Sequence, residues 1–143
     1  MTEAEFEKLV DCRWPYKDTQ RSRELIAMGA SISPNAAFIA LHELCHLPRS
    51  ADPKSTELLE LVDFWLGAFD HPLASSIAMC AKFIIENKEL SIPEALAMME
   101  AIEAHPGLHA ALAIAYFSCN DSTGVVSARY EVIRATWNEP NQL

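Results

Sequence analysis

One short segment of the chain, His42-Glu43-Leu44-Cys45-His46, has residue types and a spacing that could do chemistry. On a helix, residues four apart lie one turn above one another, so the two imidazoles could bind the same zinc ion. The intervening Glu43 could then act as a general base on a metal-bound water. The segment therefore indicates a zinc-dependent hydrolase, with His42 and His46 as metal ligands and Glu43 as the catalytic base.

The stretch from His42 to Leu47 resembles the active-site helix of zinc metallopeptidases, which carry the same H-E-x-x-H pattern. The resemblance implies zinc as the cofactor, peptide hydrolysis as the activity and a third protein ligand. Asp52 follows His46 at the distance at which one metallopeptidase group has that ligand. Other residues that a suitable fold could bring to the metal are Glu57, Glu60 and His71.

A structural interpretation of the same segment needs no metal. At 100° per residue, Leu41 and Cys45 fall on the buried face of the helix. His42 and His46 then lie on the flank of that face, and Glu43 points almost directly away from it. Two histidines at a helix C-terminus are favoured as imidazolium by the helix dipole. We rank this interpretation, without zinc, above the hydrolase.

A stripe of carboxylates is the second candidate site. In the segment 53–70, apolar side chains cover most of a predicted helix, and the remaining sector carries Glu57, Glu60, Asp63 and Asp70. Such a stripe is either a solvated face that keeps an acidic protein soluble or an electronegative surface that steers a basic partner. We take these four residues as the candidate binding residues.

The composition limits the partners and the compartment. The 143 residues hold 20 Asp and Glu against 11 Lys and Arg, a net charge of -9, which argues against binding to the phosphates of a nucleic acid. The acidic N-terminus does not look like a signal peptide. The longest uncharged stretch, 104–120, barely reaches the lower length limit for a membrane span and contains His105, Pro106, Gly107 and His109. Four cysteines without a C-x-x-C pair suit thiols in a reducing compartment. We expect a cytoplasmic protein that does not bind a membrane.

The elements that must position these residues are all predicted to be helices. Thr2 with Glu5 and Ser91 with Glu94 form capping boxes, and Pro follows a turn or capping residue at 34, 53, 72 and 106. Gly29 is a natural C-cap for a helix that begins near Asp18. No segment alternates with the two-residue period of a strand. The sequence predicts about eight helices in a single all-α domain, 1–143.

Prolines 34, 72 and 106 precede similar segments, small residues followed by larger apolar ones, and recur with a period of about 34 to 40 residues. Two helices per period is typical of stacked antiparallel hairpins in a HEAT-like α-solenoid. An irregular helical bundle has connections of much the same length, so both architectures remain open.

These observations favour a small, acidic, cytoplasmic protein-binding module without a cofactor, whose acidic surface engages a basic protein. An immunity- or antitoxin-like inhibitor of a basic partner is one concrete version. The alternative is the zinc-dependent hydrolase built on His42, Glu43 and His46. A structural subunit of a helical assembly is a third interpretation, and the oligomeric state is open.

Overall fold

A computed structural model describes residues 1–11, 14–15, 18–46 and 55–138 of the chain. These residues form eight α-helices and no strand, which confirms the all-α prediction. The helices are α1 (Glu3–Val10), α2 (Thr19–Ile32), α3 (Pro34–Cys45), α4 (Ser55–Ala68), α5 (Ala74–Ile85), α6 (Ile92–Glu103), α7 (His109–Phe117) and α8 (Val125–Asn138).

The predicted capping boxes begin α1 and α6. Thr2 and Ser91 each accept the backbone N–H of the glutamate three residues on, and each glutamate accepts the N–H of its capping residue in return. Ser33 caps α3 by accepting the N–H of Ala36 at 3.0 Å, with Pro34 at the first helical position as predicted. The predicted helix start at Pro53 lies outside the described residues.

Two of the predicted helix starts were placed too early. The residues Pro72 and Pro106 lie in turns, and α5 and α7 begin at Ala74 and His109. Before α5 the turn closes on His71, whose ring Nδ1 accepts the N–H of Leu73 at 3.1 Å. The helix therefore starts only after this turn is complete.

The predicted helix end at Gly29 was also wrong, because α2 continues to Ile32. The glycine is needed for close packing instead. A Cβ at this position would lie 2.8 Å from Cζ of Phe6 and 3.0 Å from the carbonyl oxygen of Ala36. Phe6 is fully buried. The missing side chain thus lets α1 dock closely against α2 and the first turn of α3.

The centre of the molecule is α3, which contacts α1, α2, α4, α5 and α7. Eight of its twelve residues are buried, and alanines in its first turns allow neighbouring helices to approach. The buried Trp65 of α4 donates its indole N–H to the backbone carbonyl of Ala37 at 2.7 Å. The core is therefore assembled around one helix that has neighbours on several sides.

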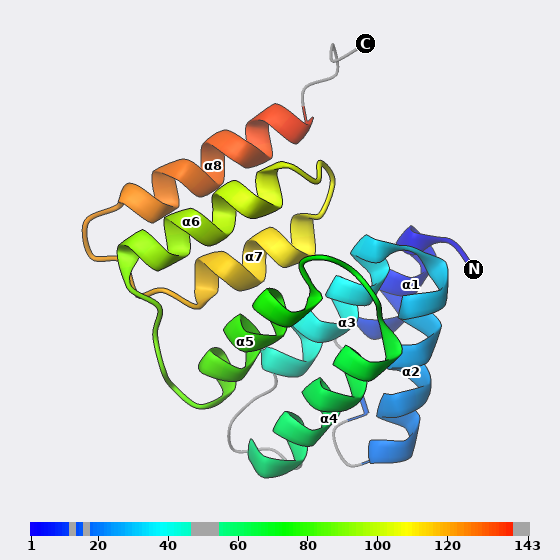
Figure 1. The fold of residues 1–143 in the computed structure, drawn as a ribbon. Helices are drawn as coiled ribbons and strands as arrows, with labels where there is room; N and C mark the ends of the chain where they lie inside the picture. The colour runs from blue at the N-terminus through cyan, green and yellow to red at the C-terminus, as the bar shows by residue number, and fades with distance from the viewer. Residues whose placement is uncertain (12–13, 16–17, 47–54, 139–143) are drawn as a thin grey trace.

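The order of contacts is that of a helical bundle, and the HEAT-like solenoid is not confirmed. In a solenoid each hairpin contacts only its neighbours along the chain. Here α3 packs directly against α7, which bypasses the hairpin of α4 and α5. Figure 1 shows α6, α7 and α8 side by side, with α3 and α5 between them and the helices α1, α2 and α4. The bundle leaves a groove where α1, α3, α7 and α8 meet.

Within the described ranges, no helix has the length and the apolar character needed to cross a bilayer.

Candidate binding groove

The groove where α1, α3, α7 and α8 meet has a volume of about 680 Å³. One wall carries four carboxylates, Glu3, Glu7 and Asp11 from the α1 segment and Glu43 from α3. The opposite wall carries His109 of α7 and Tyr130 and Arg134 of α8. Arg134 is the one lysine or arginine among the described residues that line it. We call this feature the acidic groove.

The sequence of α1 places three of these carboxylates in a row. Residues 3, 7 and 11 are four apart, so they form one row along the helix, directly beside the row of the buried Phe6 and Val10. Like charges four apart destabilise a helix by about 0.2–0.5 kcal/mol per pair. Asp11 also sits at the C-cap, where the helix dipole disfavours a negative charge. The helix dipole favours only Glu3, in the first turn, so the positions of Glu7 and Asp11 are held by the packing of α1.

Hydrogen bonds fix the end of the groove nearest the start of α1. Glu3 accepts from the Ser33 hydroxyl at 3.0 Å and from the side-chain amide of Asn35. The amide oxygen of Asn35 in turn accepts the backbone N–H of Ala110 at 3.2 Å. A single asparagine of α3 thus connects α1 to the first turn of α7.

Glu43 is the residue whose chemistry the groove changes most. Burial, followed by the negative charges of Asp11 and Glu7, raises the pKa of its carboxyl to about 7. We expected Glu43 to point almost directly away from the buried face, and in the structure the side chain on that side is still not left in solvent. It is half-buried and lines the groove because α1 packs against that side of α3.

The two histidines of the H-E-x-x-H segment lie against each other. Their rings are stacked, with centroids 4.2 Å apart and an interplanar angle of 21°. His46, the C-cap of α3, donates from Nδ1 to the carbonyl of His42 at 3.0 Å if that nitrogen carries the proton. Its ring also meets Phe117 edge-on, with centroids 5.0 Å apart.

The expected imidazolium form is not supported at His42. Burial, and secondarily the neighbouring His46, lowers the pKa of His42 to about 4. Burial also lowers the pKa of His46. Near neutral pH the His42 ring is therefore uncharged, because the loss of hydration outweighs the attraction of the helix C-terminus.

The zinc interpretation gains no third ligand from the parts of the chain that the structure describes, where no group of three His, Cys, Asp or Glu could hold a metal ion. The candidate third ligand Asp52 lies outside the described residues. His71 instead stacks on Phe69 and meets His105 edge-on, with centroids 5.1 Å apart. Zinc binding through His42 and His46 stays a prediction.

The four residues of the predicted stripe are all exposed, with Glu57, Glu60 and Asp63 on α4 and Asp70 just beyond its end at Ala68. Asp63 pairs with Lys82 of α5, whose Nζ lies 2.6 Å from its carboxylate oxygen. None of the four residues lines the acidic groove. Their binding role stays a prediction, and the structure adds a second, more enclosed acidic surface.

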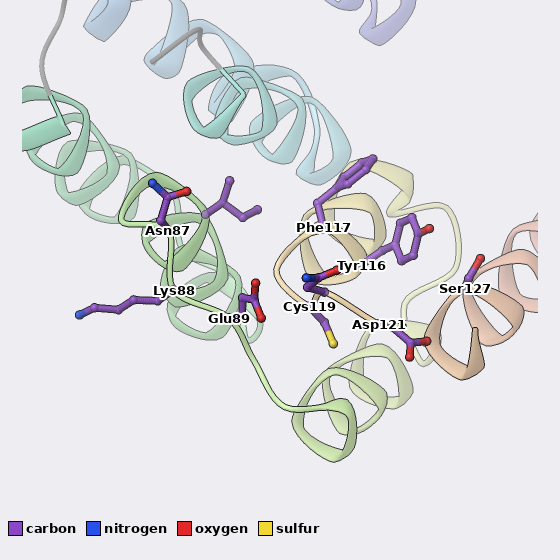
Figure 2. Close-up of a pocket in the computed structure, with 10 residues that line it drawn as sticks. Asn87, Lys88, Glu89, Tyr116, Phe117, Cys119, Asp121 and Ser127 are labelled. Atoms are coloured by element: carbon purple, nitrogen blue, oxygen red, sulfur yellow. The ribbon is translucent and has the colours of Figure 1, made fainter. Parts of the chain in front are cut away.

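A smaller pocket of about 350 Å³ lies where α5 and α7 end and α8 begins. In Figure 2, Glu89 points toward Cys119, and Lys88 extends away from the pocket. Its wall includes Tyr116, which stacks on Tyr130 of the acidic groove at a centroid distance of 4.5 Å. The tyrosine pair therefore separates the two cavities.

The groove residues on α1 and α8 were not singled out from the sequence. The spacing of Glu3, Glu7 and Asp11, in a row beside the buried Phe6 and Val10, was a signal that could have found the acidic wall. Nothing comparable in the sequence indicates that Tyr130 and Arg134 face that wall. Their position depends on the packing of α8 against α7 and of α7 against α3, which brings α8 near α1 although the two helices are far apart in the chain.

Comparison with known proteins adds no relative, since no protein-family model, no curated protein and no solved structure matches the chain.

Proposed function

We propose that the chain is a protein-binding module that holds a cationic side chain of a basic partner in the acidic groove. The observation that carries this proposal is the crowding of Glu7, Asp11 and Glu43 in one partly enclosed groove. The same negative charges that raise the pKa of Glu43 attract a cation that enters the groove. An immunity- or antitoxin-like inhibitor of a basic protein remains one concrete version.

Electrostatics give a rough scale for this preference. Two opposite unit charges about 4 Å apart attract by about 4 kcal/mol at the effective dielectric near a protein surface. Part of this attraction is offset when the cation and the carboxylates lose water. A bound Lys or Arg would also lower the pKa of Glu43 toward its ordinary value. Binding should therefore release a proton from Glu43 when the pH lies below about 7 but above the lower pKa of the bound state. Well above pH 7, Glu43 is already ionised, and binding should release almost no proton.

The charge of the whole chain supports the same kind of partner. A net charge of -9 attracts a basic protein over a distance of about one Debye length and raises its association rate. Arg134 shows that the groove has room for a guanidinium at its edge. Its Cζ lies 5.3 Å from the centroid of the Tyr130 ring, and it pairs with the exposed Glu131 at 3.3 Å.

The experiment compares two double variants that each replace two carboxyl groups by amides, on different surfaces. Glu7→Gln with Glu43→Gln changes two of the four carboxyl groups of the groove, and Glu60→Gln with Asp63→Asn changes two of the four in the stripe. The probe is a short fluorescent peptide with a single Arg in a Gly-Ser background, measured by anisotropy at low and high salt. We expect the groove variant to weaken binding about tenfold and the stripe variant to change it little.

Equal weakening by the two variants would mean that the peptide senses only the overall charge, and the groove would lose its role. Stronger weakening by the stripe variant would move the site to Glu57, Glu60, Asp63 and Asp70. Wild-type binding that does not respond to salt would contradict the electrostatic basis of both surfaces.

A further inference from the structure

The start of α5 is held by the imidazole of His71. Leu73, the N-cap of α5, makes no side-chain capping bond. Its backbone N–H is donated to Nδ1 of His71 at 3.1 Å, and the N–H of Ala74 is donated to the His71 carbonyl at 3.0 Å. The helices α1, α3 and α6 begin instead on Thr or Ser hydroxyls. A hydroxyl keeps its proton across the physiological pH range, whereas an imidazole titrates within it.

The hydrogen bond to Leu73 fixes the protonation state of the His71 ring. A ring nitrogen accepts a hydrogen bond only with a free lone pair, so the neutral ring carries its proton on Nε2. A second proton must therefore bind to Nδ1, the atom that accepts the N–H of Leu73. The imidazolium has two N–H donors and no acceptor. Protonation of His71 and this hydrogen bond exclude each other.

The surroundings of His71 also disfavour a positive charge on its ring. The ring stacks on Phe69 and meets Phe38 of α3 edge-on, with centroids 5.6 Å and 5.7 Å away. His105, in the connection between α6 and α7, meets it at 5.1 Å, and Figure 1 shows this connection beside the start of α5. Among the described residues, the titratable groups that face the ring are His105 and, next in the chain, Asp70. Burial, followed by the charge of His105, lowers the pKa of His71, and Asp70 opposes this in part.

We propose that His71 is an acid-sensitive latch, whose protonation on Nδ1 opens the turn before α5 and separates it from the connection between α6 and α7. Protonation leaves the N–H of Leu73 without its acceptor. Leu73 is buried, with 7% of its surface exposed, so water reaches this N–H only when the turn moves. Two protonated rings at the contact of His71 with His105 also repel each other. The latch uses none of the carboxylates of the acidic groove and does not depend on the proposed function.

The pH dependence of the latch has a definite direction. Because the pKa of His71 in the folded state lies below its ordinary value of 6.5, the unfolded chain binds the proton more tightly. The stabilisation is fully present above about pH 6.5 and is lost as the pH falls through the folded pKa. Glu43 acts in the opposite direction, since its contribution is lost as the pH rises through about 7. Overall stability mixes the two effects, so the latch needs a local measurement.

The first experiment follows the His71 ring and the Leu73 amide by NMR from about pH 7.5 to about pH 5. The reference is the amide of Ala95, which donates to the Ser91 carbonyl at 2.9 Å at the start of α6. We expect the hydrogen-exchange protection factor of Leu73 to fall about tenfold or more relative to that of Ala95, with the midpoint of the His71 titration. A ring that titrates while Leu73 keeps its protection would overturn the proposal. So would an equal loss at both amides, because the opening would then be global.

The second experiment uses His71→Asn, which keeps an acceptor at this position and removes the titration. An Asn side chain accepts the N–H two residues on in an Asx-turn, and Asn before Pro favours a turn. In this variant Leu73 should keep its protection at about pH 5, where the wild type has lost it. His109→Asn is the matched control, because it removes another half-buried imidazole, one that packs on Trp137, and should respond like the wild type. A wild-type pH response in His71→Asn, or a lost response in His109→Asn, would show that His71 is not the latch.

Discussion

Replacing Glu43 by Gln should make the protein more stable above about pH 7 and leave its stability nearly unchanged at about pH 4.5. The folded state binds the Glu43 proton more tightly than the unfolded chain does, because burial, Asp11 and Glu7 raise the carboxyl pKa from 4.5 to about 7. The stability of the wild type is therefore fully present below pH 4.5 and falls as the pH rises through 7. Gln carries no proton to lose, so the variant lacks this decline.

The size of the effect follows from the pKa difference. A difference of about 2.5 corresponds to about 3 kcal/mol at 1.36 kcal/mol per pKa unit. Since Glu43 is only half-buried, screening by solvent reduces this value, and we expect about 1 to 2 kcal/mol at pH 8.5. For a domain of this size, that gain would raise Tm by roughly 3 to 8 °C.

The assay is urea unfolding followed by circular dichroism at several pH values between about 4.5 and 8.5. Glu60→Gln is the matched control, because it removes the same charge from an exposed position on α4 and should change stability by no more than about 0.5 kcal/mol. If wild type and Glu43→Gln lose stability in parallel as the pH rises, the carboxyl pKa of Glu43 is not raised by burial and by the neighbouring carboxylates of the groove.

Two further predictions concern packing and metal. Gly29→Ala should destabilise the protein by about 1 to 2 kcal/mol, because the added Cβ would press on Phe6. Gly67→Ala has no atom within 4 Å of the added Cβ and should stabilise α4 by about 0.5 to 1 kcal/mol. Urea unfolding of both variants tests this pair, and a gain of stability in Gly29→Ala would contradict the close docking of α1. Protein purified without added metal should contain well below one zinc per chain by elemental analysis, and one zinc per chain that disappears in His46→Ala would reverse our ranking of binding module and hydrolase.

The helices could be predicted from the sequence because their signals are local. A capping box such as Thr2 with Glu5 acts within one turn, and its geometry is nearly independent of the rest of the chain. The starts of α5 and α7 were missed for a local reason too. Pro72 and Pro106 suit a turn as well as a helix start, and at Pro72 the ring of His71 selects the turn.

The groove could not be predicted because it depends on distant pairings. A helix with one buried face would leave Glu43 in solvent, but α3 has neighbours on several sides, and α1 covers the side that carries Glu43. The same burial keeps His42 uncharged, where a helix considered alone favours imidazolium. The packing of neighbouring helices therefore changes both the exposure of Glu43 and the charge of His42 from what the isolated helix predicts.

The shortness of α1 has a consequence for how the acidic groove operates. Eight residues are too few for a stable isolated helix in water, so α1 is helical because Phe6 and Val10 dock into the core. Release of α1 is then a local opening that requires less free energy than global unfolding. When α1 is released, three of the four carboxylates leave the groove together. The apparent affinity for a cationic partner is therefore the intrinsic affinity scaled by the fraction of molecules with α1 docked, and a bound partner increases that fraction in return.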